Sequence, residues 1–198
     1  ITLSFYKYFN LGNPSLFRDH LFISWSKIDV LGRIYVANEG INAQLSVPKE
    51  NIEKFKKSIS EITPLNHIRL NIALEHYSKS FLKLTIKIKE KIVADGLNEN
   101  TFDVTKIGEH LDAERFNQML EDKNTICIDM RNHYESEIGF FKGAIKPDVD
   151  TFRESLEVID RELEKNGKEK NYLMYCTGGI RCEKASAYLK HKGIHNVF

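Results

Sequence analysis

The pattern of hydrophobic and polar positions differs between the two parts of this chain of 198 residues. In the first part, apolar residues at every second position predict strands over residues 3–9, 32–37, 41–47 and 81–88. Helical spacing predicts one helix that runs from Asn13-Pro14 to Trp25, with Asn13 as N-cap and Pro14 as the first helical residue. A second helix follows Pro48. The order β-α-β-β-α-β predicts an α+β domain of the ferredoxin-like, split βαβ type.

In the second part of the chain, from residue 94 onward, short apolar runs alternate with amphipathic segments. It predicts helices over residues 109–121 and 152–165, strands over 125–130 and 172–175, and a helix after residue 181. This α/β alternation favours a parallel sheet with helices on both faces.

A polar, turn-rich stretch at residues 94–100 predicts a linker, and therefore domains at 1–93 and 94–198. Residues 195–198 resemble the opening of a further strand, so we expect the second domain to be truncated at its C-terminal end.

The balance of acidic and basic residues says little about which kind of molecule the protein binds. With 29 basic and 28 acidic residues the net charge is +1, so any case for nucleic-acid binding has to be local. No apolar run reaches membrane-spanning length, and no segment predicts a protein partner. Three cysteines are too few, and odd in number, for a disulfide framework, which favours a reducing compartment and hence the cytoplasm.

One segment carries candidate chemistry: Cys176, Thr177, Gly178, Gly179, Ile180 and Arg181 lie between a predicted strand and a predicted helix. Such a loop turns backbone N–H groups inward and ends at a helix N-terminus, and both features favour an anion. A cysteine at its head has a lowered pKa, which predicts that Cys176 is a nucleophile. Arg181 closes the loop with a permanent positive charge. The alternative is a buried cysteine at a strand end, followed by two turn glycines.

The loop is one residue shorter than the cysteine loops of phosphatases, which disfavours phosphate and suits a smaller group on Cys176. Asp129 and Arg131 follow the other buried strand and are expected at the same sheet edge. Asp129 is expected to accept hydrogen bonds from loop N–H groups. Arg131 either binds a substrate phosphate or orients the loop, or else pairs with Asp129 or Glu135.

The two other cysteines have different expected roles. Cys182 either resolves an oxidised Cys176 or packs under the loop as a small buried residue. Cys127 is expected in the core.

The segment from Cys176 to Arg181 resembles the active loop of rhodanese domains, as Asp129-Met130-Arg131 resembles their Asp-x-Arg motif. Residues 137–145 resemble a further rhodanese segment, with Phe140 where many members carry His. The longer stretches 176–185 and 32–42 together resemble the oxygen-dependent tRNA uridine hydroxylases, which join an acylphosphatase-like domain to a rhodanese domain.

The resemblance implies hydroxylation of the wobble uridine of tRNA to 5-hydroxyuridine, with Cys176 in the active site, molecular oxygen as co-substrate and a link to prephenate. The sequence has no flavin, dinucleotide or metal-binding motif. A sulfurtransferase that carries a persulfide on Cys176 is the alternative. A non-catalytic RNA-binding module is a third reading, which the intact cysteine disfavours.

A local basic stripe is the best candidate for RNA contact. Lys83, Lys87, Lys89 and Lys91 are predicted on one face of the last strand of the first domain, opposite Leu82, Leu84, Ile86 and Ile88. The stripe either follows an RNA backbone or is a solvated face that protects a sheet edge.

Overall fold

The computed structural model describes residues 1–74, 80–98 and 101–198. The chain divides into two compact units, Ile1–Ile92 and Val93–Phe198. Two residues of the predicted linker, Glu99 and Asn100, lie outside the described residues. Within the described part of the chain, no helix is both long and apolar enough to cross a membrane.

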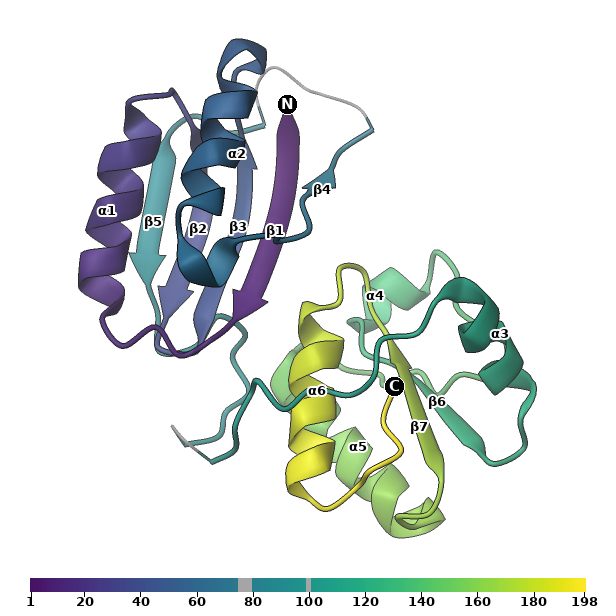
Figure 1. The fold of residues 1–198 in the computed structure, drawn as a ribbon. Coiled ribbons are helices and arrows are strands. Elements are labelled where there is room, and N and C mark those ends of the chain that lie inside the picture. The colour runs from purple at the N-terminus through teal and green to yellow at the C-terminus, as the bar shows by residue number, and fades with distance from the viewer. Residues whose placement is uncertain (75–79, 99–100) are drawn as a thin grey trace. The chain divides into compact units, whose positions relative to one another are not determined.

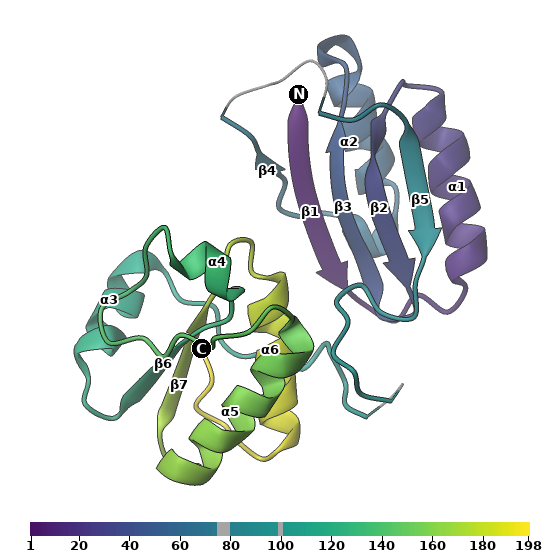
Figure 2. The ribbon, with the colours of Figure 1, turned by 180° about the vertical axis from the view of Figure 1, so that it is seen from behind.

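The first unit is a five-stranded sheet in the order β4-β1-β3-β2-β5, with two helices on one of its faces (Figures 1 and 2). Its strands are β1 (Thr2–Tyr8), β2 (Leu31–Ala37), β3 (Gly40–Ser46), β4 (Asn71–Ile72) and β5 (Leu84–Ile88). Its α-helices are α1 (Pro14–Ser26) and α2 (Ile52–Ser60), and short 3₁₀ turns span Lys49–Asn51 and Thr63–Leu65. The predicted order of strands and helices is confirmed, with β4 as an unpredicted addition.

The core of this unit lies between the helices and the sheet. Trp25 is fully buried, with Phe55 at a ring-centroid distance of 5.2 Å, and it donates a hydrogen bond to Ser58 Oγ at 3.0 Å. The predicted cap of α1 is confirmed, because Asn13 Oδ1 accepts the N–H of Leu16 at 3.0 Å.

The last strand of this unit differs from its prediction. β5 begins only at Leu84 and pairs in parallel with β2 at one edge of the sheet, whereas β4 pairs with β1 at the other. Of the four apolar residues predicted on the face opposite the lysines, only Ile86 is buried; Leu82 is 89% exposed and Ile88 44%. A strand at the edge of a sheet has a neighbouring strand on one side only. The alternation of apolar and polar residues along its sequence therefore predicts more buried side chains than the structure shows.

The second unit is built around two parallel strands, β6 (Thr125–Asp129) and β7 (Asn171–Tyr175). Single parallel bridges, Ile128 to Ile145 and Tyr172 to Val197, extend the ladder on both sides. The helices are α3 (Ala113–Glu121), α4 (His133–Ser136), α5 (Phe152–Asn166) and α6 (Ile180–His191). The parallel sheet is thus confirmed.

Two helices of this unit depart from expectation. α3 begins at Ala113 and not at residue 109, because the side chain of Asp112 accepts the N–H of Arg115 at 2.9 Å and caps the helix there. α4 is a single turn that the sequence pattern did not predict.

A buried ion pair fixes α6 in this unit. Lys184 and Asp95 have fully buried side chains, and Nζ of Lys184 lies 2.8 Å from Oδ2 of Asp95. The same ammonium donates to the carbonyl of Val93 at 2.6 Å, and Oδ1 of Asp95 accepts the N–H of Leu97 at 2.9 Å. The pair therefore joins the start of the unit to the helix that follows Cys176.

Replacing Asp95 with Ala leaves the Lys184 ammonium buried without its carboxylate. We expect the free energy of unfolding of the second unit to fall by about 3–5 kcal/mol, measured by chemical denaturation of the intact protein. Glu61→Ala is the matched control: Glu61 pairs with Lys57 at 3.9 Å on the surface, so its loss is expected to cost less than about 1 kcal/mol. Equal effects of the two substitutions would contradict the structural role assigned to the buried pair.

Candidate active site

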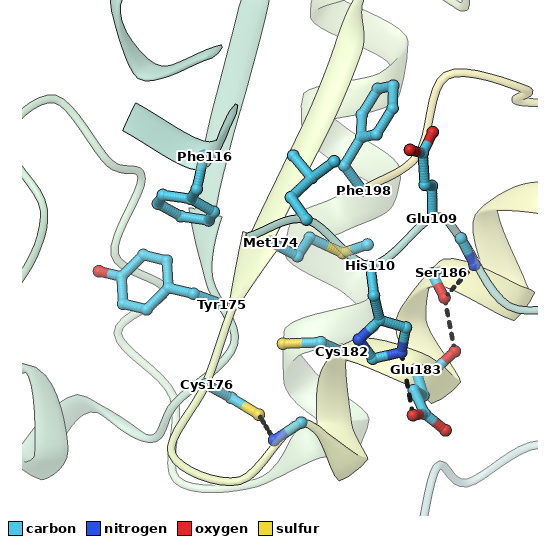
Figure 3. Close-up of a pocket in the computed structure, with 13 residues that line it drawn as sticks. Glu109, His110, Phe116, Met174, Tyr175, Cys176, Cys182, Glu183, Ser186 and Phe198 are labelled. Carbon is cyan, nitrogen blue, oxygen red and sulfur yellow. Dashed lines mark hydrogen bonds and ion pairs between the residues drawn. The ribbon is translucent and has the colours of Figure 1, made fainter. Parts of the chain in front are cut away.

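Cys176 directly follows β7, and its sulfur turns back toward the start of α6 (Figure 3). The N–H of Gly179 donates to Cys176 Sγ at 3.0 Å. Gly179 has φ +90, a left-handed conformation that disfavours any side chain, and it is the N-cap of α6. The sulfur thus lies at the N-terminal end of a helix of 12 residues, where the helix dipole favours negative charge.

Cys182 lies in the first turn of α6 and lines the same cavity as Cys176 (Figure 3). The pKa of Cys176 is lowered to about 5. The largest cause is a hydrogen bond from the Cys182 thiol; backbone N–H groups and Arg181 add to it, and burial of the sulfur opposes it. The neighbouring thiolate and burial raise the pKa of Cys182 well above its ordinary value. At neutral pH the pair is therefore a thiolate at Cys176 and a thiol donor at Cys182.

Arg181 is engaged by a carboxylate at the loop. Its Nη1 and Nη2 lie 2.6 and 2.9 Å from the two carboxylate oxygens of Glu135 in α4, and the hydroxyl of Thr177 donates to the same carboxylate. The N–H of Asn132 donates to Glu135 Oε2 at 3.1 Å. Arg181, against the cost of burial, lowers the pKa of Glu135 to about 2. From the sequence, Glu135 is expected only as a possible partner of Arg131, because nothing in a four-residue helix identifies a long-range partner such as Arg181.

Asp129 and Arg131 form a second charge pair at the same sheet edge. Asp129 is fully buried; its Oδ1 accepts Nε of Arg131 at 2.9 Å and its Oδ2 accepts Nη2 at 2.7 Å. The hydroxyl of Tyr175 donates to Oδ2 at 2.8 Å. Burial alone raises the pKa of Asp129, but these hydrogen bonds outweigh it and the pKa is lowered.

For Arg131 the structure shows the pairing with Asp129, and for Asp129 it corrects the expected partners. Arg131 pairs with Asp129, and Nη2 also donates to the carbonyl of Gly139 at 2.6 Å. The partners of Asp129 are Arg131 and Tyr175, in place of the N–H groups of the cysteine loop that were predicted.

A cavity of about 200 Å³ opens beside the two sulfurs. Apolar and aromatic side chains supply most of its wall, and His110 and Glu183 supply polar atoms (Figure 3). The third cysteine, Cys127, is buried elsewhere in the core, and burial raises its pKa to about 12. Among the described residues, no group of three or more His, Cys, Asp or Glu side chains is arranged to hold a metal ion.

The predicted lysine stripe lies in the first unit and is less regular than expected. Only Lys87 lies within β5; Lys83 precedes the strand, and Lys89 and Lys91 follow it. Lys83, Lys87 and Lys89 are exposed, Lys91 is half-buried, and Nζ of Lys89 lies 5.5 Å from the centroid of the Tyr35 ring.

The low pKa of Cys176 is testable by alkylation. We expect the rate of reaction with iodoacetamide to rise with pH around a midpoint near 5, well below the ordinary value of 9.0. Cys182→Ala removes the thiol donor and is expected to move the midpoint upward, and Cys182→Ser, which keeps a donor, to move it less. Cys127→Ala is the control and should leave it unchanged. A midpoint that is the same in all four proteins would exclude the role of Cys182.

Glu135 gives a second prediction, on stability against pH. Its pKa is depressed from an ordinary 4.5 to about 2, so its stabilising contribution is complete above pH 4.5 and is lost as the pH falls toward 2. We expect Glu135→Gln to lower the unfolding free energy at pH 7 and to reduce its fall between pH 4.5 and 2, measured by urea denaturation. Parallel curves for the two proteins would show that the pair with Arg181 adds no stability.

Comparison with known proteins assigns both units. Residues 1–92 match the family model of the UPF0176 acylphosphatase-like domain, and residues 112–198 match that of the rhodanese-like domain. Over 99% of its length the chain is 57% identical to the tRNA uridine(34) hydroxylase of Leptospira interrogans, of which it covers 53%. Over its whole length it is 52% identical to the protein of the same name from Photorhabdus laumondii, of which it covers 56%.

The chain spans about half the length of the curated relatives that it matches. Both matches nevertheless extend over at least 99% of this chain, and therefore over both of its units. The chain therefore belongs to the family whose members are named tRNA uridine(34) hydroxylase, and it joins an acylphosphatase-like domain to a rhodanese-like domain.

Proposed function

We propose that this protein takes part in the oxygen-dependent hydroxylation of the wobble uridine of tRNA to 5-hydroxyuridine, with Cys176 as the reacting group. The observation that carries the proposal is the position of the Cys176 sulfur, which accepts the Gly179 N–H at 3.0 Å and lies with Cys182 at an apolar cavity. The name of the relatives supplies the substrate and the position on the tRNA.

The thiolate is suited to act on a pyrimidine ring. Addition of a thiolate to C6 of uracil forms a C–S bond and moves the electron pair of the C5–C6 double bond onto the ring carbonyl, which makes C5 electron-rich. Molecular oxygen is the co-substrate. One of its atoms enters the product at C5, and the other is reduced to water by a two-electron donor. Loss of the C5 proton then breaks the C–S bond, restores the C5–C6 double bond and releases Cys176 as the thiolate. The family resemblance links prephenate to this reaction.

Two further parts of the proposal concern the surroundings of the reaction. Lys83, Lys87 and Lys89, which are exposed in the first unit, are candidates for phosphate contacts with the tRNA, together with the half-buried Lys91. The three cysteines are all free thiols, which agrees with a reducing, cytoplasmic setting.

The test is mass spectrometry of nucleosides from the tRNA of cells that lack the gene, complemented with the full-length protein or its variants. Wild type and Cys127→Ala are expected to restore 5-hydroxyuridine and its derivatives. Cys176→Ser is expected to leave them lower by on the order of 100-fold or more, because the serine hydroxyl is a far weaker nucleophile at neutral pH.

Two results would contradict the proposal. Full hydroxylation with Cys176→Ser would remove the cysteine from the reaction. Unchanged 5-hydroxyuridine combined with loss of thiolated uridine would identify a sulfurtransferase with a persulfide on Cys176.

A further inference from the structure

We infer that the cavity beside Cys176 is a pocket for a pyrimidine base, and that His110, oriented by Glu183, accepts a hydrogen bond from the polar edge of that base. The inference rests on the proposed function and adds to it the residue that recognises uracil. Four features of the second unit carry it: a fixed segment that bears His110, the bond to Glu183, aromatic walls, and two sulfurs in the same cavity.

The segment that carries His110 is held rigidly against α6. Gly108 N–H donates to Ser186 Oγ at 2.8 Å, and this hydroxyl in turn donates to the carbonyl of Glu183 at 2.7 Å. Glu109 N–H donates to the carbonyl of Val197 at 3.0 Å. A Cβ on Gly108 would lie 2.5 Å from that same carbonyl oxygen, so only glycine permits this approach. His110 is therefore placed by its backbone.

The bond between His110 and Glu183 sets the chemistry of the ring. Nε2 of His110 lies 3.1 Å from Oε1 of Glu183, whose side chain is only 17% exposed (Figure 3). Of the two neutral tautomers of the ring, a carboxylate at Nε2 favours the one with its proton on Nε2, which leaves Nδ1 as an acceptor. Uracil presents an N–H at N3, whereas cytosine presents a lone pair there. An accepting Nδ1 thus selects uracil.

The remaining walls suit a flat, uncharged ring. Phe116 and Tyr175, which both line the cavity, lie with their ring centroids 6.4 Å apart and nearly perpendicular. They lie on one side of the sulfurs and His110 on the other in the view of Figure 3. Met174 and Phe198 add apolar surface. Aromatic and apolar side chains beside one hydrogen-bonding group are what enzymes that act on an extruded base present to it.

The test compares anticodon stem-loop RNAs that carry uridine, cytidine or an abasic sugar at the wobble position. Binding is measured by fluorescence anisotropy with the full-length protein carrying Cys176→Ser, so that no reaction occurs. We expect uridine to be preferred over both alternatives. His110→Ala should weaken binding of the uridine RNA by roughly 3- to 10-fold, the usual effect of losing one hydrogen bond, and should leave binding of the abasic RNA unchanged.

His110→Gln offers an amide oxygen as acceptor, and we expect it to recover part of the preference for uridine over cytidine. His195→Ala is the matched control, because His195 is exposed in the same unit and does not line the cavity. Thermal unfolding of each variant separates a loss of recognition from a loss of structure.

The outcomes separate this inference from the proposed function. Equal binding of the uridine and abasic RNAs would overturn the base pocket, as would an undiminished preference for uridine in His110→Ala. In either case, 5-hydroxyuridine formed by the protein with Cys176 intact would leave the proposed function standing. If that protein formed none, the proposed function would fail, and the inference with it.

Discussion

The site depends on keeping one sulfur negatively charged at the carboxyl edge of two parallel strands. β6 and β7 are in register, with Asp129 opposite Tyr175, so the turns that follow the two strands meet at one place. The charge on Cys176 is then stabilised by donors built into the fold, the N–H of Gly179 and the thiol of Cys182. Such fixed donors need no rearrangement when charge develops or is lost. A left-handed Gly179 is what allows the turn to aim its N–H at the sulfur.

Each of the two arginines of the site is paired with a carboxylate, and Arg181 also helps to lower the pKa of Cys176. The guanidinium of Arg181 lies on Glu135, and that of Arg131 lies on Asp129. In a phosphatase, the corresponding arginine is available to the phosphate oxygens. Here both charges are largely balanced by carboxylates, and the adjoining wall is aromatic and apolar. The local charge balance therefore disfavours a phosphate group at this loop, which is also what the short loop predicts.

Local sequence patterns predict most of the fold, whereas most contacts of the candidate site join residues that are far apart in sequence. Three predicted features depend on residues that are close in sequence, and the structure confirms each of them. They are the cap at Asn13, the α+β and α/β patterns of the two units, and the strand, loop and helix around Cys176. The partner of Arg181 is 46 residues away in a one-turn helix that has no periodicity to detect. His110 was predicted to lie in a helix, but the cap at Asp112 places it before the helix begins, and only the folded chain brings it into one cavity wall with Cys182. The alternation of apolar and polar residues likewise does not predict that β5 pairs with β2.

One helix links these long-range contacts. The N-cap Gly179 bonds Cys176, Cys182 lines the cavity, Glu183 holds His110, and Ser186 fixes the segment that carries that histidine. Lys184, on the same helix, is fully buried against Asp95. Because a rigid helix displaces all its side chains together, a shift of α6 would move the sulfur donors and the histidine wall at once. The buried ion pair between Lys184 and Asp95 is therefore part of what holds the cavity in shape, and substitutions there are expected to disturb recognition as well as stability.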